Sequence, residues 1–183
     1  FTVALDNSLP FAKFSKKTFQ TITPKIFAKY TSGTQLNALN NNKILNYSDI
    51  FSMNRTNNLD LPETGFSMGH GINYSLKRKK DDNSILFSTN TGIGQVLRTS
   101  RQDKMPNKSS LNNKSSDFAG FLKFGLFGDK NELKTNNTDK ILFINDFEEN
   151  RLSFNYDYNL SNDFNNLNRN SFNLSGTYKK LYS

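Results

Sequence analysis

The stretch that indicates the fold most clearly is TGFSMGHGINYSLK, residues 64–77. Apolar or aromatic side chains alternate in it with small and polar ones over about 13 residues, which is the two-residue period of a β-strand. At about 3.3 Å per residue such a strand would span roughly 40 Å, enough to cross a bilayer at a steep tilt. The row predicted to face lipid is Phe66, Met68, Ile72 and Tyr74, and the row predicted to face a polar lumen is Ser67, Asn73 and Ser75.

The same alternation returns twice near the carboxyl end, in residues 151–161 and 170–179. In the first of these, the row predicted to face lipid is Phe154, Tyr156 and Tyr158, and the row predicted to face the lumen is Asn155, Asp157 and Asn159. Further strands are expected at 19–30, 84–98 and 117–127, with a weaker candidate at 140–147. Pro24 predicts a bend or a sheet edge, because proline cannot donate to the ladder. No segment has the 3.6-residue period of a helix, so the chain is predicted to be all-β and antiparallel, with about eight strands.

The connections between these strands are polar and uneven in length. Outer-membrane barrels combine short periplasmic turns with longer external loops. On this pattern, residues 78–83 are predicted to form a periplasmic turn and residues 99–115 an external loop, at opposite sides of the membrane. Residues 1–183 are therefore predicted to be a single segment of a transmembrane β-barrel, forming part of its wall. Because the chain starts and stops within this pattern, we expect it to be a piece of a longer protein.

Composition excludes several classes of protein. The chain has 183 residues, no cysteine and one histidine, which leaves out disulfide scaffolds, thiolate metal sites, cysteine nucleophiles and two-histidine metal centres. Hydrophobic residues make up 34% and the mean hydropathy is −0.69, which suits strands that are apolar on one face only. No apolar run approaches the length of about 18 residues that a transmembrane helix needs. The net charge of +8 includes the basic run 77–80, interpreted as a turn facing anionic lipid headgroups, because no nucleic-acid-binding module accompanies it.

The sequence contains no catalytic constellation. His70 lies mid-strand on the apolar row without a partner at a readable spacing, so a structural role is expected. Gly92 and Gly94 lack the third glycine and the helix of a dinucleotide fingerprint, and are expected to allow close backbone approach or a bend. The adjacent carboxylates at 81–82 and 148–149 would point to opposite faces of an extended chain, which predicts turn residues. We therefore expect neither an enzyme nor a cofactor.

Residues 49–65 carry a more specific signal. The run 49–55, then Leu59 and Asp60, then Glu63, Thr64 and Gly65 resemble a segment of the LptD (OstA) family, the barrel proteins of lipopolysaccharide assembly. The likeness continues at Gly94, Gln95, Arg98, residues 104–106 and 110–111, Ser116 and Asp117. The order and spacing of these short motifs carry the resemblance, which covers most of the chain and is firmest over residues 49–125.

The resemblance implies an outer-membrane translocon that receives lipopolysaccharide from a periplasmic bridge protein and inserts it into the outer leaflet. A polar lumen would hold the sugar head while the acyl chains pass through an opening in the wall. The implied partners are lipopolysaccharide, an LptE-like lipoprotein plug, the bridge protein and the lipids of the outer membrane. Family members often have cysteines that link the barrel to a periplasmic domain. This sequence contains neither, so disulfide-dependent maturation is not inferred for it.

Three other functions remain open on the residue patterns alone. A porin-like passive channel of the outer membrane shares every feature of the strand pattern but has no reason to carry the ordered motif of residues 49–117. A β-rich adhesin fragment would bind through its loops. An outer-membrane lipase would need a serine–histidine pair, and the one histidine, His70, is predicted to face lipid.

Overall fold

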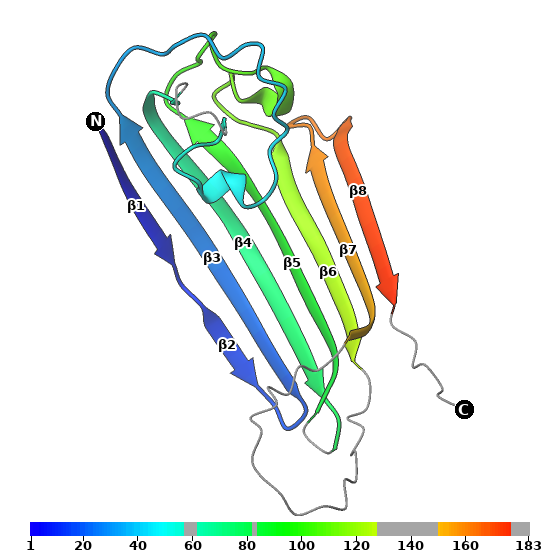
Figure 1. Ribbon diagram of the computed structural model, residues 1–183. Helices are drawn as coiled ribbons and strands as arrows, with labels where there is room; N and C mark the ends of the chain where they lie inside the picture. The colour runs from blue at the N-terminus through cyan, green and yellow to red at the C-terminus, as the bar shows by residue number, and fades with distance from the viewer. Residues whose placement is uncertain (57–61, 82–83, 128–149, 177–183) are drawn as a thin grey trace, which may run out of the picture.

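The computed structural model describes residues 1–56, 62–81, 84–127 and 150–176 (Figure 1). It contains one antiparallel sheet of eight strands in the order β1-β3-β4-β5-β6-β7-β8, and β2 also pairs with β3. The strands are β1 (Thr2–Ser8), β2 (Phe11–Phe14), β3 (Thr18–Thr31), β4 (Gly65–Lys79), β5 (Ile85–Arg98), β6 (Phe118–Phe127), β7 (Asn150–Leu160) and β8 (Leu167–Gly176). The described residues also form two 3-10 turns, η1 (Asp49–Phe51) and η2 (Lys108–Ser110). No helix in this part of the chain is long and apolar enough to cross a membrane.

The predicted all-β, antiparallel class is confirmed. Each strand expected within the described residues corresponds to an observed strand, with ends that shift by a few residues. The candidate strand at 140–147 lies outside the described residues. Strands β1 and β2 were not predicted, because Leu9 and Pro10 interrupt the alternation between two short pieces.

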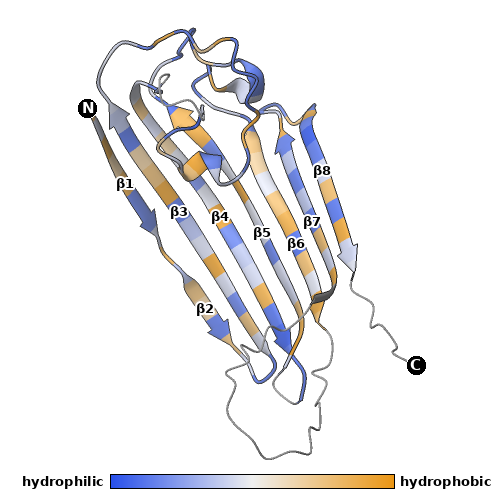
Figure 2. Ribbon diagram, in the orientation of Figure 1, coloured by the Kyte–Doolittle hydropathy of each residue, from blue (hydrophilic) through white to orange (hydrophobic). Residues whose placement is uncertain are grey.

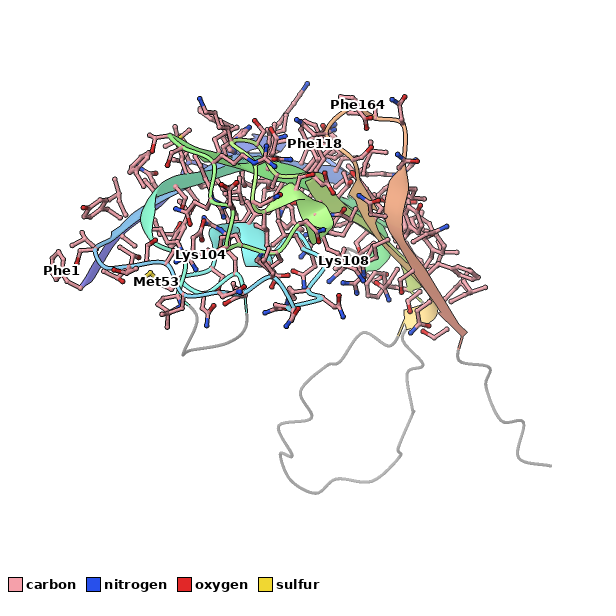
Figure 3. All side chains as sticks on the ribbon, turned by 90° about the horizontal axis from the view of Figure 1, so that it is seen from above. Phe1, Met53, Lys104, Lys108, Phe118 and Phe164 are labelled. Atoms are coloured by element: carbon pink, nitrogen blue, oxygen red, sulfur yellow. The ribbon has the colours of Figure 1, made fainter. Side chains whose placement is uncertain are left out.

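The register places the two rows of each strand on opposite faces of the sheet. Ile72 of β4 pairs with Ile93 of β5, and Asn73 pairs with Gly92. Because directly paired residues point to the same face, each row continues from strand to strand across the sheet. Figure 3 shows that the sheet is curved. We call the side that carries Asn73 the concave face and the side that carries Ile72 the convex face.

Apolar residues recur on strand after strand of the sheet, as the orange bands in Figure 2 show, and the register places most of the exposed ones on the convex face. Phe66 and Ile72, both on the inner strand β4, expose 42% and 45% of their surface. An exposed apolar area of this extent is unusual for a protein surface in water. The large apolar side chains exposed on this face include Val3, Leu5, Phe11, Ile22, Ile26, Tyr30, Phe66, Ile72, Phe172 and Leu174.

The hydrophobic core lies on the concave face, at the end of the sheet where the long loops gather (Figures 1 and 3). The connection between β3 and β4 comprises residues 32–64, and we call it the strap; its described parts, residues 32–56 and 62–64, fold back over this face. The connection between β5 and β6, residues 99–117, packs beside it. Buried core residues come from the strap (Leu45, Tyr47 and Ile50), from the β5–β6 connection (Met105 and Leu111) and from the wall (Val96, Ala119 and Phe121).

Candidate functional site

The strap rests on a patch of wall that carries no side chains. This glycine floor consists of Gly69 and Gly71 of β4 and Gly92 and Gly94 of β5. A Cβ atom on Gly69 would overlap the carbonyl oxygen of Ile50, and one on Gly92 would lie 2.9 Å from Cζ of Tyr47. Glycine at 69 therefore lets the strap backbone reach the sheet, and glycine at 92 makes room for the ring of Tyr47. At Gly92 and Gly94 the strap approaches through the side chains of Tyr47 and Ile50, whereas its backbone comes closest at Gly69.

Glu63, near the carboxyl end of the strap, is buried among three cations. Its Oε2 accepts a hydrogen bond from Nη1 of Arg55 at 2.7 Å and pairs with Nζ of Lys29, also at 2.7 Å. Its Oε1 accepts from Nε of Arg98 at 2.9 Å. Arg55 belongs to the strap, Lys29 to β3 and Arg98 to β5, so one carboxylate joins the strap to two strands of the wall.

Three cations around one carboxylate leave a surplus of positive charge. Carbonyl oxygens of the strap accept hydrogen bonds from two of these cations. Nη2 and Nε of Arg55 donate to the carbonyl oxygen of Ile50 at 3.0 and 3.2 Å. Nζ of Lys29 donates to the carbonyl oxygen of Met53 at 2.7 Å. Buried charges with such hydrogen bonds are far less costly than unpaired ones, so the cluster also fixes the path of the strap backbone.

The charge state of Glu63 follows from its neighbours. Burial by itself would raise the pKa of this carboxyl, but the attraction of Arg98, Arg55 and Lys29 outweighs burial and lowers the pKa to about 2. Glu63 is therefore ionised at neutral pH. An ionised carboxylate with its oxygens occupied suits a structural latch, and it has no free proton for general-acid chemistry.

A second polar network ties the loops together at the same end of the sheet. The carboxylate of Asp117 is buried, and its Oδ1 accepts from Oγ of Ser110 at 2.8 Å. Its Oδ2 accepts from Nδ2 of Asn168 at 2.7 Å. The backbone N–H of Asp117 donates to the carbonyl oxygen of Ser109 at 2.9 Å. The network thus joins the β5–β6 connection to the start of β8.

Motif residues that are distant in the sequence meet in these networks. Arg55, Glu63 and Arg98 form the first, together with Lys29. Close to the second, Nε2 of Gln95 donates to the carbonyl oxygen of Ser116 at 2.7 Å. Leu59 and Asp60 lie outside the described residues. Several of the residues that carry the resemblance therefore hold the strap and the neighbouring loops in place.

The predicted rows fall on opposite faces of the sheet. Those expected to face lipid lie on the convex face: Phe66, Met68, Ile72, Tyr74, Phe154, Tyr156 and Tyr158. Those expected to face a lumen lie on the concave face: Ser67, Asn73, Ser75, Asn155, Asp157 and Asn159. Two of the latter bind the strap or its anchor, since Oγ of Ser67 accepts from Arg55 and Nδ2 of Asn159 donates to the carbonyl oxygen of Leu45.

The remaining candidates show no arrangement for catalysis or metal binding. His70 lies on the convex face opposite Gln95, and its Nδ1 has no hydrogen-bond partner among the described residues. Asp81 pairs with Lys17 at 2.5 Å, as expected of a turn residue, whereas residues 82 and 148–149 lie outside the described ranges. No group of three or more potential metal ligands occurs in the described part of the chain.

Lys29 is the member of the Glu63 cluster that sequence reasoning missed. It lies within a correctly predicted strand, on the row that faces the strap, and its side chain is almost completely buried. Lys29 lies two residues after Phe27, on the same row of the strand. A lysine on such a row indicates a carboxylate partner, because lysine is rarely buried without one.

Comparison with known proteins adds no relative. No family model matches the chain, and no curated protein or solved structure matches it either.

Proposed function

We propose that this chain is part of the wall of an outer-membrane β-barrel that inserts lipopolysaccharide into the outer leaflet. The observation that carries the membrane part of the proposal is the contrast between the two faces. The convex face exposes apolar side chains on strand after strand, including Phe66 and Ile72. On the concave face the strap covers the apolar residues of the wall, and Asn73 and Ser75 lie on the part beyond the core. A sheet in contact with lipid outside and water inside needs this arrangement.

Barrel closure is part of the proposal. In hydrocarbon an unpaired backbone N–H or carbonyl costs several kcal/mol. The sheet has one edge at β1 and β2 and the other at β8. If this sheet spans a bilayer, both edges must be paired, either with each other or with further strands. The barrel would then enclose the concave face, the strap and the loop networks.

The transport part of the proposal rests on the ordered motif. A passive channel requires a polar interior, but it does not require the particular set that includes Arg55, Glu63 and Arg98. These residues fix the strap against the wall and so determine the shape of the interior at one end. The sugar part of lipopolysaccharide would pass along the polar concave face, while its acyl chains remain on the convex, apolar side.

Such a division of the substrate needs an opening in the wall, and the edge at β1 and β2 suits it best. The edge is interrupted at Leu9 and Pro10. Pro24 of β3 faces this interruption, accepting a hydrogen bond from the N–H of Leu9 at 3.1 Å but offering no N–H in return. The ladder along this edge is therefore interrupted, which favours an opening here.

The second candidate is a porin-like passive channel, which the polar concave face alone would support. In that case the strap would serve as the constriction that selects solutes. Enzymatic activity has no support from the arrangement of the described side chains.

Depletion of the full-length protein in its own cell tests the proposal. We expect newly made lipopolysaccharide to accumulate in the inner compartments, while porins still assemble in the outer membrane. Re-expression of wild-type protein should restore transport, and a variant with Glu63→Gln should restore it poorly. A defect limited to uptake of small solutes would overturn the transport proposal and favour the channel.

A further inference from the structure

Charged side chains are rare on the convex face of the described strands. Of the residues that the strand pairings place on this face, two are Lys, Arg, Asp or Glu: Lys13 of β2 and Arg78 of β4. Both are basic and exposed, and both lie at the end of the sheet opposite the strap, which we call the turn end. A face in contact with hydrocarbon tolerates charge where it meets the lipid headgroups, so these two residues indicate that level.

The length of β4 is consistent with this level. At about 3.3 Å per residue, Arg78 lies roughly 20 Å along the strand from Ile72. With the strand tilted by about 40°, this length spans about 15 Å of the membrane normal, half of a hydrocarbon core of about 30 Å. If Ile72 lies near the middle of the bilayer, Arg78 therefore reaches the lipid phosphates. Phe87, which pairs with Arg78, packs near Phe124 with ring centroids 6.0 Å apart, and aromatic rings favour the same level.

Further cations gather at the turn end from two hairpins that lie side by side (Figure 1). The backbone N–H of Lys79 donates to the carbonyl oxygen of Lys17 at 2.8 Å, which joins the end of β4 to the turn after β2. Lys16 and Lys17 of that turn are exposed. Among the described residues, one carboxylate lies with these cations: Asp81, which pairs with Lys17 at 2.5 Å. The described part of the turn end therefore has a surplus of positive charge.

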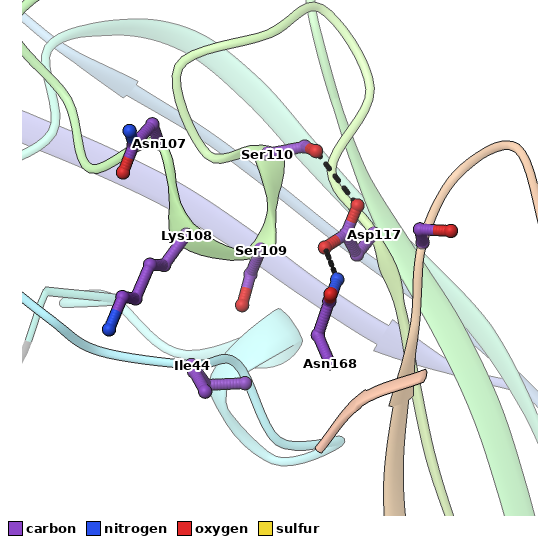
Figure 4. A pocket seen from close by; sticks show the side chains of 8 residues that line it. Ile44, Asn107, Lys108, Ser109, Ser110, Asp117 and Asn168 are labelled. Carbon is purple, nitrogen blue, oxygen red and sulfur yellow. Dashed lines mark hydrogen bonds between the residues drawn. The ribbon is translucent and has the colours of Figure 1, made fainter. Parts of the chain in front are cut away.

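The loop end of the sheet differs in its charge. Residues of both signs lie together there, since Lys108 and the carboxylate of Asp117 line the same pocket (Figure 4). Glu63 likewise lies among the cations of its cluster. On the convex side of this end, the described row that contains Tyr30 and Phe66 has no charged residue. An attraction for anionic lipid is therefore expected at the turn end alone.

Strand alternation divides the basic run 77–80 between the two faces. Arg78 lies on the convex face, whereas Lys77 pairs with Phe19 and Ser88 on the concave face. The side chains of Arg78 and Lys13 have no ionic partner among the described residues. An acidic protein segment would approach from water and could use Lys77 as readily as Arg78. A lipid in contact with the convex face can use Arg78 but not Lys77.

We propose that Lys13 and Arg78 form a site on the convex face for a phospholipid with a net negative charge. Its phosphate would lie between the two cations, where Thr18 and Gln20 of β3 share the convex face and can donate hydrogen bonds. Its acyl chains would lie along the apolar row that begins at Phe11, nearer the middle of the sheet. Clustered cations at a membrane surface favour anionic over neutral lipids.

This proposal rests on the membrane part of the proposed function and not on transport. The turn after β4 is predicted to be periplasmic, so the bound phospholipid would belong to the inner leaflet of the outer membrane. Free phosphate compounds share the anionic group but lack acyl chains, and the convex position favours the lipid.

Native mass spectrometry of the full-length protein, released from neutral detergent micelles, tests the site. The probes are phosphatidylglycerol and phosphatidylcholine with the same acyl chains, which differ in net charge. We expect phosphatidylglycerol to bind more tightly. Arg78→Gln and Lys13→Gln should each weaken phosphatidylglycerol binding about fivefold, the factor that one cation contributes at an anionic lipid surface. Phosphatidylcholine binding should not change. Both side chains are exposed, so neither substitution should impair folding.

Lys77→Gln is the matched control, because it removes the same charge one residue away on the opposite face. We expect it to leave phosphatidylglycerol binding unchanged. Equal losses in Lys77→Gln and Arg78→Gln would mean a general charge effect and would overturn the site. A loss in Lys77→Gln alone would place the anion on the concave side, as for an acidic protein segment, and would also overturn it. So would phosphatidylcholine that binds as tightly as phosphatidylglycerol, or a wild-type protein that binds neither.

Competition with glycerol 3-phosphate distinguishes the lipid from a free phosphate compound. It carries the anionic group without acyl chains, so we expect it not to displace phosphatidylglycerol. Complete displacement would mean a site for a small phosphate compound, and the lipid assignment would be wrong. If phosphatidylglycerol binding fails while depletion still blocks lipopolysaccharide transport, the lipid site is wrong and the proposed function stands.

Discussion

Arg98 and Glu63 are separated by 35 positions in the sequence, yet Nε of Arg98 donates to Oε1 of Glu63 at 2.9 Å inside the protein. Arg98 is the last residue of β5, and Glu63 precedes β4. Their contact fixes the point at which the strap re-enters the sheet. Both side chains are almost inaccessible to solvent, so salt screens the attraction between them only weakly.

Glu63→Gln should strongly destabilise the folded chain. Removing the one carboxylate leaves three buried cations without a counter-charge, and breaking a buried pair in this way costs about 3–5 kcal/mol. The free energy of unfolding in denaturant measures the effect. Asp103→Asn is the control, because Asp103 forms an exposed pair with Arg101 and its loss should be nearly neutral. Equal effects of the two changes would contradict a stabilising role for the cluster.

The dependence of stability on pH should reflect the low pKa of Glu63. Its pKa of about 2 in the folded protein lies below the usual value of 4.5, so the folded state favours the ionised form. The stabilisation is present above pH 4.5 and is lost as the pH falls through about 2. Unfolding curves measured between neutral and strongly acid pH check this window. In Glu63→Gln this component of the acid sensitivity should be missing.

Arginine substitutions should distinguish the two faces of β4. If Ile72 lies near the middle of a bilayer, Ile72→Arg should cost about 2–4 kcal/mol of stability. Ser75 lies on the concave face, two residues along β4 from Asn73. Ser75→Arg should cost much less stability, because its charge reaches water. Unfolding of both variants from lipid vesicles measures the difference. Equal losses would argue against a membrane-spanning sheet.

Gly69→Ala should displace the strap. The added methyl group would overlap the backbone of Ile50, and forcing extra atoms into a packed site typically costs about 1–3 kcal/mol. Limited proteolysis within residues 32–64 and thermal unfolding both report the change. Ser75→Ala alters a small residue of the same row away from the floor and should leave strap cleavage unchanged.

Backbone amides of β1 and β2 should exchange hydrogen faster than those of β4 and β5. The first two strands are short, lie at an edge and are separated at Leu9 and Pro10. Strands β4 and β5 are each paired on both sides over most of their length. Hydrogen exchange followed by mass spectrometry checks the order. Equal protection would remove the structural reason for an opening at this edge.

Strand periodicity was enough to predict most of the sheet and the division of its residues between two faces. The alternation in residues 64–77 is a local property, and a sheet with one apolar face preserves it. It also led to the correct placement of Phe154 and Asn155 on opposite faces. Strands β1 and β2 escaped prediction because Pro10 interrupts a pattern that is already short.

Strap docking could not be predicted from the same reasoning. Its contacts, such as Asn159 with Leu45 and Arg98 with Glu63, join residues that are far apart in the sequence and obey no period. The glycines at 69, 71, 92 and 94 indicated close approach but not what approaches. The buried position of Lys29 depends on Glu63, which becomes its neighbour only after β3 and β4 have paired.

The glycine floor also affects the entropy of assembly. A side chain that becomes buried loses rotamer freedom, at a cost of up to about 2 kcal/mol for the longest residues. Gly69, Gly71, Gly92 and Gly94 have no rotamers to lose, so at the floor itself docking costs side-chain entropy only on the strap's side. Once β4 and β5 have paired, the floor already has its final shape. The wall therefore acts as a preformed template, and the strap is the partner that must become ordered to fit it.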